Sequence, residues 1–501
     1  MNLDLLHQET ATLLRQDLGD VGHSEYDAAW VARVPRTDQR NMPEFPRVLE
    51  EILRRQSDDG GWEKDARYVS TRIQTTLASC LALLQFPLEP HYLERARHGA
   101  HFTQKMWERL PQDPEPALGF ELVVASLIEE ACRMGLPLSH LRQDSRDIQA
   151  RKLARVTPDL IYSPRLSIGF SLEFMLDDLD VEKALHLRVA NGSLGDSIAA
   201  TAHHARLSGD PTSYAFLRRI VNTYGPARIP YAEGNLWGTI WTLYNLDLAG
   251  LLSTHKDLAA PHIAQIEQHI HDEGISWSSH VAYGDGDDTA IGFHVLDNWG
   301  SEVNWDLLRQ YERDEGFITF RAESHPSTST NANVLTAISK HPYDGSRETS
   351  EKIIRILLSW RNADGFWTDK WHASPFYPTS RAMLAIIRAE RANLPDLVPT
   401  IEWLLRNQRD DGSWGFFESG TAEETAYAVQ ALTHVFRAGY DIHDSVFLAA
   451  ERYLIRANQH GYDDHPKLWI AKSLYGPISV IRSAVISALA LIQGIGSSAS
   501  A

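Results

Sequence analysis

The feature of this sequence that most constrains its fold is a short turn that recurs along the chain. Each copy combines Asp or Asn with Gly, and most copies end on Trp. The copies are Gln56–Trp62 (QSDDGGW), His271–Trp277 (HDEGISW), Arg361–Trp367 (RNADGFW), Asn407–Trp414 (NQRDDGSW), and a fifth around Gly192 that has Leu194 in place of Trp. Apolar patterns with a period near 3.6 follow these turns, and they begin at Ser, Thr or Asp, which cap helices well. The repeating unit is therefore predicted to be helix, tight turn, helix.

Stacked helix pairs at this spacing predict an all-α fold, because strand signals are scarce. Such pairs either form an open solenoid or close into a double-ring barrel, and the short, regular loops favour closure. A chain of 501 residues exceeds one ordinary domain. Residues 140–235 contain several Pro breaks and fewer Trp turns, so they are assigned to a second helical domain. Trp62 and Trp414 are predicted to be packing anchors rather than site residues.

Composition excludes several classes of protein. With 48 Lys and Arg against 66 Asp and Glu, the net charge is −18, which disfavours binding to nucleic acid. Hydrophobic residues make up 43%, too many for a disordered chain. We expect no transmembrane segment, because no apolar run of about eighteen residues is evident, and no secretory signal in the first residues. Cys80 and Cys132 are expected to be small buried side chains. These features predict a cytoplasmic protein.

Three carboxylates stand together ahead of one apolar helical pattern. Asp285, Asp287 and Asp288 lie within four residues in the string GDGDDTAIGF. An EF-hand loop is excluded because no Glu follows at the spacing that such a loop needs. Crowded carboxylates beside apolar residues cannot all ionise cheaply, so crowding is predicted to keep one of them protonated well above the ordinary aspartate pKa. A helix N-terminus acts in the opposite direction, since it favours the charged form.

A neutral carboxylic acid that faces an apolar, aromatic-lined cavity is suited to protonating a carbon–carbon double bond. Aromatic faces stabilise the resulting carbocation by about 0.5–2 kcal/mol each. Trp277, Tyr283 and Phe293 are the aromatic candidates nearest to the acids in the sequence, although each is equally compatible with a place in the core.

Asp285–Ala290 (DGDDTA) resembles the DxDDTA signature of class II terpene cyclases. Further blocks in the same order resemble the diterpene branch of that family, the copalyl-, halimadienyl- and kolavenyl-type diphosphate synthases. These blocks are Tyr26–Ala32 (YDAAWVA), Gly119–Leu122 (GFEL), Ser171–Glu173 (SLE), Asn191–Ser193 (NGS), Asp369–His372 (DKWH) and Leu468–Tyr475 (LWIAKSLY). The resemblance implies two α/α-barrel-like domains with the active site between them. Residues 1–44 and 246–501 would form a β-domain that carries the acid motif, and residues 45–245 an inserted γ-domain.

The resemblance also implies an isomerase that cyclises geranylgeranyl diphosphate to a bicyclic diterpenyl diphosphate and retains the diphosphate. A class I terpene synthase or a phosphatase would then consume the product. In this family the middle aspartate, here Asp287, is the general acid, and Asp285 and Asp288 support it. An Asn further along, here Asn333, hydrogen-bonds to the acid. An amide that donates to one carboxyl oxygen would orient the acid so that its proton faces the substrate.

Binding of the diphosphate would need local cations. Lys472 matches the family's diphosphate-contacting lysine, although a lone Lys on an amphipathic helix ordinarily faces solvent. The family implies Mg²⁺ as cofactor, and Asp113 and Glu115 are the candidate ligands in the short acidic stretch before the GFEL block. Two acids between prolines are equally typical of an ordinary loop.

Two departures from the plant members bear on the product. Plant ent-copalyl cyclases carry a His before the SLE block and an Asn in a second segment, and this pair positions the water that removes the final proton. Here Phe170 precedes the SLE block, and the segment around Tyr231 lacks the Asn. The first cyclised cation is therefore predicted to persist and rearrange towards halimadane or clerodane skeletons, unless another residue acts as base. Phe170, Tyr231 and Trp277 are the predicted substrate-lining residues.

Several alternatives stay open at this point. The string Asp177–Val181 (DDLDV) lacks the last acid of a class I DDxxD motif, so it is predicted to lie at the surface. A squalene-type or other polyprenyl class II cyclase would share the acid motif and the Trp turns. A helical-repeat protein without catalysis is a second alternative. A protein-prenyltransferase-like barrel would need zinc ligands, which two cysteines do not evidently supply.

Overall fold

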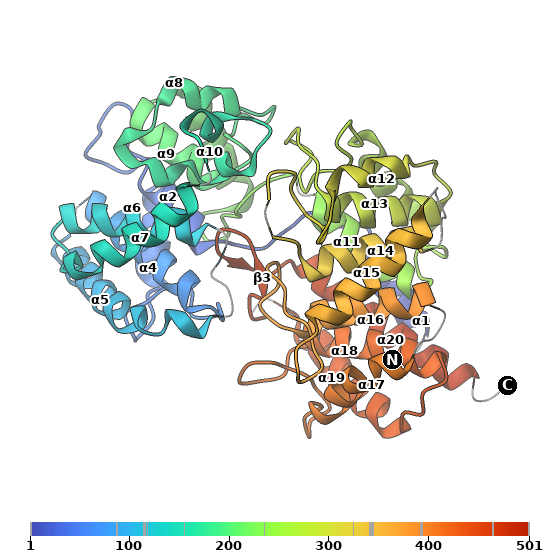
Figure 1. Ribbon diagram of the computed structural model, residues 1–501. Coiled ribbons are helices and arrows are strands. Elements are labelled where there is room, and N and C mark those ends of the chain that lie inside the picture. Colours follow the sequence, from blue (N-terminus) through green and yellow to red (C-terminus); the bar gives the residue numbers. More distant parts are fainter. Residues whose placement is uncertain are drawn as a thin grey trace.

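The computed structural model describes residues 3–86, 89–113, 117, 119–154, 156–234, 236–323, 325–339, 345–390, 394–462 and 465–498. The helices form two lobes (Figure 1), each with its own hydrophobic core. The first core contains Leu6 to Val21 and then almost every buried apolar residue from Tyr231 onward. The second core contains the buried apolar residues from Tyr26 to Ile229. The predicted all-α, two-domain architecture is confirmed.

The first lobe is a closed double ring of helices. Its inner helices pack in sequence order and the last one packs on the first; they are α11 (Leu236–Leu248), α13 (Gly286–Trp299), α14 (Thr328–Ile338), α16 (Phe376–Glu390), α18 (Ala422–Arg437) and α20 (Ile478–Ser498). The outer elements are α1 (Leu3–Leu13), α12 (Lys256–Gln268), η6 (Trp305–Tyr311), α15 (Ser346–Trp360), α17 (Leu394–Arg406) and α19 (Asp444–His460). Of the two arrangements left open by the repeats, the structure therefore has the barrel.

The second lobe is also a closed ring, although one member is a 3₁₀ segment. Its inner elements are α2 (Glu25–Ala32), α4 (Val69–Gln85), α6 (Phe120–Arg133), η4 (Ser167–Asp178) and α9 (Ile198–Ser208), which packs back on α2. The remaining elements are α3 (Pro46–Arg54), α5 (Pro90–Trp107), η1 (Leu110–Gln112), η2 (Ser139–Leu141), α7 (Arg142–Leu153), η3 (Pro158–Tyr162), α8 (Val181–Ala184), η5 (Leu185–Leu187) and α10 (Pro211–Tyr224).

The Trp turns hold outer and inner helices together. The indole N–H of Trp414 donates to the carbonyl of Leu404, 2.7 Å away at the end of the outer helix. Its backbone N–H donates to Thr425 Oγ1 on the inner helix at 3.0 Å. Trp62 and Trp367 form the same pair of bonds. The packing-anchor interpretation of Trp62 and Trp414 is thus supported by identical geometry in each turn.

Two short hairpins interrupt the helices. One pairs β1 (Glu312–Arg313) with β2 (Gly316–Phe317), and the other pairs β3 (Trp469–Ile470) with β4 (Leu474–Tyr475). The second hairpin lies between the lobes (Figure 1). Its side chains alternate, as a strand requires: Trp469 and Tyr475 belong to the first core, whereas Ile470 and Leu474 belong to the second. This hairpin therefore joins the two barrels.

The cores divide the chain at other positions than the sequence suggested. Segment 26–34, which the sequence predicts as part of the 1–44 piece of the first domain, packs in the second core through α2. Helix α11, assigned mostly to the 45–245 insert, closes the ring of the first barrel. The divisions fall between Val21 and Tyr26 and between Ile229 and Tyr231. The resemblance gave the order of the domains, but only packing shows which ring each helix completes.

The chain contains an apolar run of about eighteen residues, although the sequence was expected to have none. Within the described residues, the segment Ile478–Ile495 of α20 is long and apolar enough to cross a bilayer by length and composition alone. However, 72% of it is buried inside the barrel, where it forms part of the inner ring.

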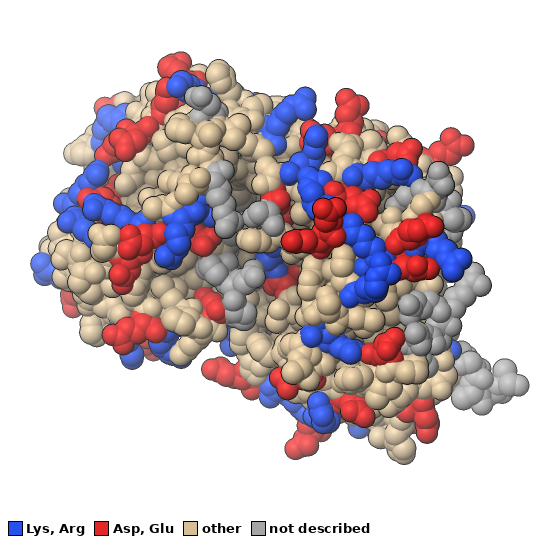
Figure 2. Space-filling view, viewed as in Figure 1, with Lys and Arg blue, Asp and Glu red and all other residues tan. Residues whose placement is uncertain are grey.

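Cys80 is buried as expected and Cys132 is partly buried. On the face shown in Figure 2, basic and acidic side chains are interspersed over both lobes.

Candidate active site

The three clustered aspartates lie at the N-terminus of α13, an inner helix of the first barrel. Asp285 is the N-cap, and its Oδ1 accepts the backbone N–H of Asp288 at 2.7 Å. Gly286 fits against the loop before α14, where a Cβ atom would lie 2.7 Å from the carbonyl oxygen of Ile318. This cap places Asp287 and Asp288 in the first helical turn. All three are buried, with exposed fractions of 1%, 6% and 3% in chain order.

Burial raises the pKa of all three carboxyls, and it is a larger cause than their mutual repulsion. The pKa of Asp287 rises to about 8, because burial outweighs the hydrogen bond from Asn333. The pKa of Asp285 rises only to about 6, because hydrogen bonds from Asp288 offset part of the burial effect. Burial, followed by the charge of Asp285, raises the pKa of Asp288 well above its ordinary range. At neutral pH, Asp285 is therefore charged and the other two are neutral. The sequence-based expectation of one protonated acid, held by crowding, is corrected in both number and cause.

Asp287 is held by one amide. Asn333, in the middle of α14, donates from Nδ2 to Asp287 Oδ1 at 2.6 Å, so the contact that the resemblance implied is present. Among the described residues, the Asp287 carboxyl forms no further hydrogen bond. Behind Asn333 lies Arg381 of α16, whose Nε donates to Asn333 Oδ1 at 2.7 Å. The Arg381 guanidinium lies 3.9 Å from the ring centroid of Tyr244. Neither Arg381 nor Tyr244 was singled out in the sequence.

A continuous row of aromatic rings, here called the aromatic belt, leads away from the acid. Neighbouring rings in the belt have centroids between 4.5 and 6.4 Å apart. In order, its members are Tyr377, Trp469, Trp237, Tyr475, Tyr231, Trp277 and Phe170. Burial raises the pKa of Tyr377, and the charges of Arg381 and Asp287 also act on it, which places Tyr377 at the acid end. The Lys472 ammonium lies 4.4 Å from the Phe170 centroid, at the opposite end.

The predicted substrate-lining residues thus come together, although they are far apart in sequence. Phe170 contributes from η4, Tyr231 from the segment between the barrels and Trp277 from the loop before α13. In this turn the backbone N–H of Ile275, rather than that of Trp277, donates to Thr289. Trp277 therefore does not make the anchoring bond that Trp62, Trp367 and Trp414 make. Phe293 does not join the belt; it packs against Trp305 in the core, 5.8 Å away.

Four members of the belt were not predicted from the sequence: Tyr377, Trp237, Trp469 and Tyr475. Trp469 and Tyr475 lie in a block on which the resemblance rests. That both side chains point toward the first core follows only from the hairpin that this block forms. Tyr283 adjoins the belt, where its hydroxyl accepts the indole N–H of Trp277 at 3.4 Å.

Lys472 lies in the turn of the β3–β4 hairpin and is 2% exposed, not on a solvent-facing helix. Its Nζ donates to Glu173 Oε1 at 2.9 Å and to Ser197 Oγ at 2.6 Å, both in the second barrel. Tyr26 also donates to Glu173 Oε1, at 3.0 Å, while Glu173 Oε2 is buried without a partner. A buried ammonium that contacts only one carboxylate keeps one of its three N–H donors for another acceptor.

Asp113, one of the two suggested metal ligands, is engaged by backbone groups. Both carboxylate oxygens of Asp113 accept backbone N–H groups at the start of α4, from Val69 and Ser70, each at 2.8 Å. Asp113 therefore caps α4, a role that a sequence window around Asp113 does not reveal. Glu115 lies outside the described residues. Within the described ranges, no group of three or more His, Cys, Asp and Glu side chains is arranged to hold a metal ion.

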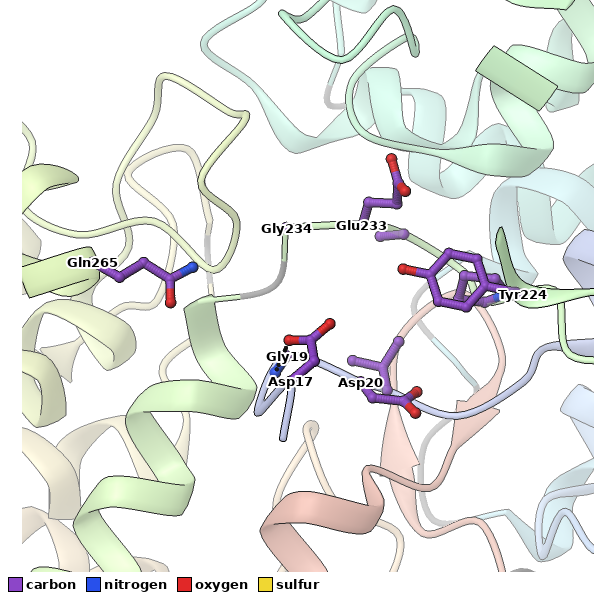
Figure 3. A pocket seen from close by; sticks show the side chains of 10 residues that line it. Asp17, Gly19, Asp20, Tyr224, Glu233, Gly234 and Gln265 are labelled. Carbon is purple, nitrogen blue, oxygen red and sulfur yellow. Dashed lines mark hydrogen bonds between the residues drawn. The ribbon is translucent and has the colours of Figure 1, made fainter. Parts of the chain in front are cut away.

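Two other features are separate from the acid site. Asp177 and Asp178 are exposed, as expected for the incomplete class I string. A small pocket of about 50 Å³ lies where the connections between the barrels meet α12, and its lining includes Asp17, Asp20 and Glu233 (Figure 3). These acids are already engaged: Asp17 and Asp20 accept backbone N–H groups two residues on, and Glu233 accepts both terminal nitrogens of Arg219.

The sequence and the fold are both similar to those of known terpene cyclases. Residues 314–448 match the squalene-hopene cyclase C-terminal domain. The chain is 29% identical to a type B diterpene cyclase of Mycobacterium tuberculosis, over 96% of this chain and 98% of that relative. It is 27% identical to ent-copalyl diphosphate synthase 2 of Oryza sativa subsp. indica, but it spans only 58% of that longer protein. Among solved structures, ent-copalyl diphosphate synthase from Streptomyces platensis matches with a TM-score of 0.79 and 28% identity, over 98% of this chain and 100% of that chain.

Proposed function

Because this chain belongs to the class II diterpene cyclases, we propose that it converts geranylgeranyl diphosphate into a bicyclic diterpenyl diphosphate by protonation. The observation that carries the proposal is Asp287, a buried carboxyl that stays protonated at neutral pH at one end of the aromatic belt. An acid of this kind protonates an alkene only if water is kept away, because water would otherwise accept the proton first. Burial of the three aspartates meets this requirement.

In the proposed step, the terminal double bond of the substrate takes the proton from Asp287 Oδ2. The π electrons form the new C–H bond, the Asp287 O–H electrons stay on the carboxylate, and a tertiary carbocation remains on the substrate. Asn333 donates to Oδ1 throughout, and its hydrogen bond becomes stronger as the carboxyl becomes charged. Internal double bonds then attack the cation in turn, and loss of a proton ends the sequence.

The aromatic belt supports the placement of the isoprenoid chain. Its rings connect the acid with Lys472, so a chain lying along it would have the reacting alkene at one end and the diphosphate at the other. Ring faces along this line stabilise positive charge on the substrate by about 0.5–2 kcal/mol each, without offering a base that would end the reaction early. The remaining N–H of Lys472 is directed to the diphosphate in this proposal, while Glu173 balances its charge in the free enzyme.

The same proposal extends to the product skeleton. Phe170 and Tyr231 take the places where the plant family has a water-positioning His and Asn, and Phe170 is packed between Lys472 and Trp277. A phenyl ring neither accepts a proton nor orders a water molecule. The first bicyclic cation is therefore proposed to undergo hydride and methyl shifts before it loses a proton, which gives a halimadane- or clerodane-type product.

We also propose Mg²⁺ as counter-ion of the diphosphate. Asp113 does not fit a protein-held metal, since both of its oxygens cap α4, so the proposed ion would be held chiefly by the substrate. A cytoplasmic location and a downstream class I terpene synthase or phosphatase complete the proposal, because the product would leave with its diphosphate intact.

The decisive assay incubates the purified protein with geranylgeranyl diphosphate and Mg²⁺, removes phosphate from the products and identifies them by mass spectrometry. We expect a bicyclic diterpene alcohol from the wild type, no product from Asp287→Asn, and wild-type yield from the control Asp177→Asn, which changes an exposed aspartate. A parallel incubation with squalene tests the triterpene alternative. Cyclised squalene, or recovery of only geranylgeraniol, would overturn the proposal.

A further inference from the structure

Arg381 is an unusual residue to find inside the first barrel. It is 4% exposed, and among the described residues no carboxylate forms a salt bridge with it. Its contacts are instead the amide oxygen of Asn333 and the ring of Tyr244. Burying an arginine without an acidic partner costs free energy of folding. The hydrogen bonds of Arg381 to Asn333 therefore explain its position better than a gain in stability does.

Chemistry allows only one orientation of the Asn333 amide beside this side chain. A guanidinium has five N–H donors and no acceptor. Both Nε and one terminal nitrogen of Arg381 approach the same amide atom, which must therefore be the oxygen. Nδ2 of Asn333 is then the atom that faces Asp287 and donates to it.

The amide in turn determines which oxygen of Asp287 carries the proton. Asp287 Oδ1 receives an N–H and so acts as an acceptor, which in a neutral carboxylic acid is the role of the carbonyl oxygen. The hydroxyl is then Oδ2, the oxygen that no described residue engages. An amide turned the other way would present its own oxygen to Oδ1 and attract the proton to that side.

We propose, on the basis of the function argued above, that Arg381 is a positioning residue that keeps the transferable proton of Asp287 on Oδ2 by fixing the orientation of Asn333. The relay Arg381, Asn333, Asp287 crosses three inner helices, α16, α14 and α13, so the ring of the barrel sets its geometry. After proton transfer the same relay stabilises the carboxylate, because the donor is already in place and the positive charge lies behind it.

The test compares three variants with a matched control. Arg381→Met keeps most of the side-chain volume but no donor, Arg381→Lys keeps a donor-only cation, and Asn333→Ala removes the relay. The control Arg388→Met lies two turns further along α16, where Arg388 donates to His294 at 3.1 Å. Steady-state rates with geranylgeranyl diphosphate are measured for each variant, for the double variant Arg381→Met with Asn333→Ala, and across pH.

We expect Arg381→Met to lower kcat by about 10- to 100-fold with little change in KM, because an interaction needed only in proton transfer is lost. Arg381→Lys recovers part of that loss, Arg388→Met keeps the wild-type rate, and the double variant is no slower than Asn333→Ala alone. Among the described residues, the groups whose charges act on Asp287 are Asp285, Asp369 and Arg381, so removing the cation of this set raises the pKa of Asp287 and moves the alkaline limb of kcat to higher pH.

A purely structural Arg381 would give a different pattern. The rate of Arg381→Met would fall only in proportion to the folded fraction, the alkaline limb would stay in place, Lys would not restore activity, and the losses of the double variant would multiply. Any of these results overturns the inference.

The inference can fail separately from the proposed function. If the wild type makes no cyclised product, the function is refuted, yet the titration of Asp287 is still read from the pH dependence of melting in variants with and without Arg381. An unchanged titration after Arg381→Met refutes the relay whether or not the substrate is right.

Discussion

Replacing Asp287 by Asn is expected to abolish catalysis and at the same time to stabilise the protein. The two side chains have nearly the same shape, and the introduced amide would still accept the hydrogen bond from Asn333 through its oxygen. What changes is the free energy that folding spends on keeping the carboxyl neutral. In the unfolded chain the carboxyl ionises freely, whereas in the native barrel it must keep its proton. An amide carries no such cost.

The size of the effect follows from the pKa values. The pKa of Asp287 rises from 3.8 to about 8 on folding, because burial penalises the charged form. The native state therefore binds a proton that the unfolded state has released, and stability falls as the pH rises between these two values. The cost is roughly 1–2 kcal/mol at pH 5 and roughly 4 kcal/mol at pH 7. Burying the introduced amide offsets part of the gain by an amount that does not depend on pH, so the change with pH is the robust quantity.

Thermal melting of the wild type and of Asp287→Asn, at one scan rate between pH 5 and pH 8, measures how their difference in stability changes with pH. The advantage of Asp287→Asn should grow by about 2–3 kcal/mol from pH 5 to pH 7, or roughly 5 °C in Tm for a domain of this size. Asp177→Asn, which alters an exposed aspartate, serves as the control and should melt like the wild type at every pH. A difference in Tm that stays constant with pH, or a variant less stable than the wild type at pH 7, would refute a buried neutral Asp287.

Three further outcomes follow from the contacts at the site. Lys472→Met combined with Glu173→Gln, which leaves no unpaired buried charge, should raise KM for geranylgeranyl diphosphate about tenfold with a smaller effect on kcat; an unchanged KM contradicts the diphosphate role. Asp113→Ala removes two bonds to the N-terminus of α4, so it should lower the free energy of unfolding by about 1–2 kcal/mol, seen as a lower Tm. The Mg²⁺ concentration for half-maximal activity should stay unchanged, and a large shift in that concentration would restore Asp113 as a ligand. Phe170→His should move the product mixture, measured by mass spectrometry, towards an unrearranged copalyl-type skeleton, and an unaltered mixture means that termination occurs elsewhere.

Local patterns in the sequence were sufficient for the all-α architecture and for the acid. The turns that end on Trp62, Trp367 and Trp414 each bond to a carbonyl ten residues earlier and to a Thr shortly after, so one helix pair determines their geometry. The acids are contiguous, and the cap at Asp285 follows from its position before an apolar helix. Their burial was implied by the neighbouring sequence, but its dominance over charge repulsion depends on the whole barrel.

What sequence reasoning missed depends on contacts between distant segments. Asp113 caps a helix more than forty residues earlier, and no local signal distinguishes such a cap from an acidic loop. Arg381 is one charge in an apolar helical pattern and would ordinarily be assigned to the exposed face, although an isolated cation at a core-facing position is the signal that could have found it. The hairpin that carries Lys472 has strands of only two residues each, too short to give a strand pattern in the sequence.

The account depends on a neutral carboxyl at Asp287, and infrared difference spectroscopy measures that state directly. Subtracting the spectrum of Asp287→Asn from that of the wild type isolates the C=O stretch of this one side chain, and the spectrum is followed as the pH is raised. We predict a protonated carboxylic acid band that is present at pH 7 and disappears with a midpoint at about 8. A carboxylate band already present at pH 6, with no acid band to lose, would contradict the account.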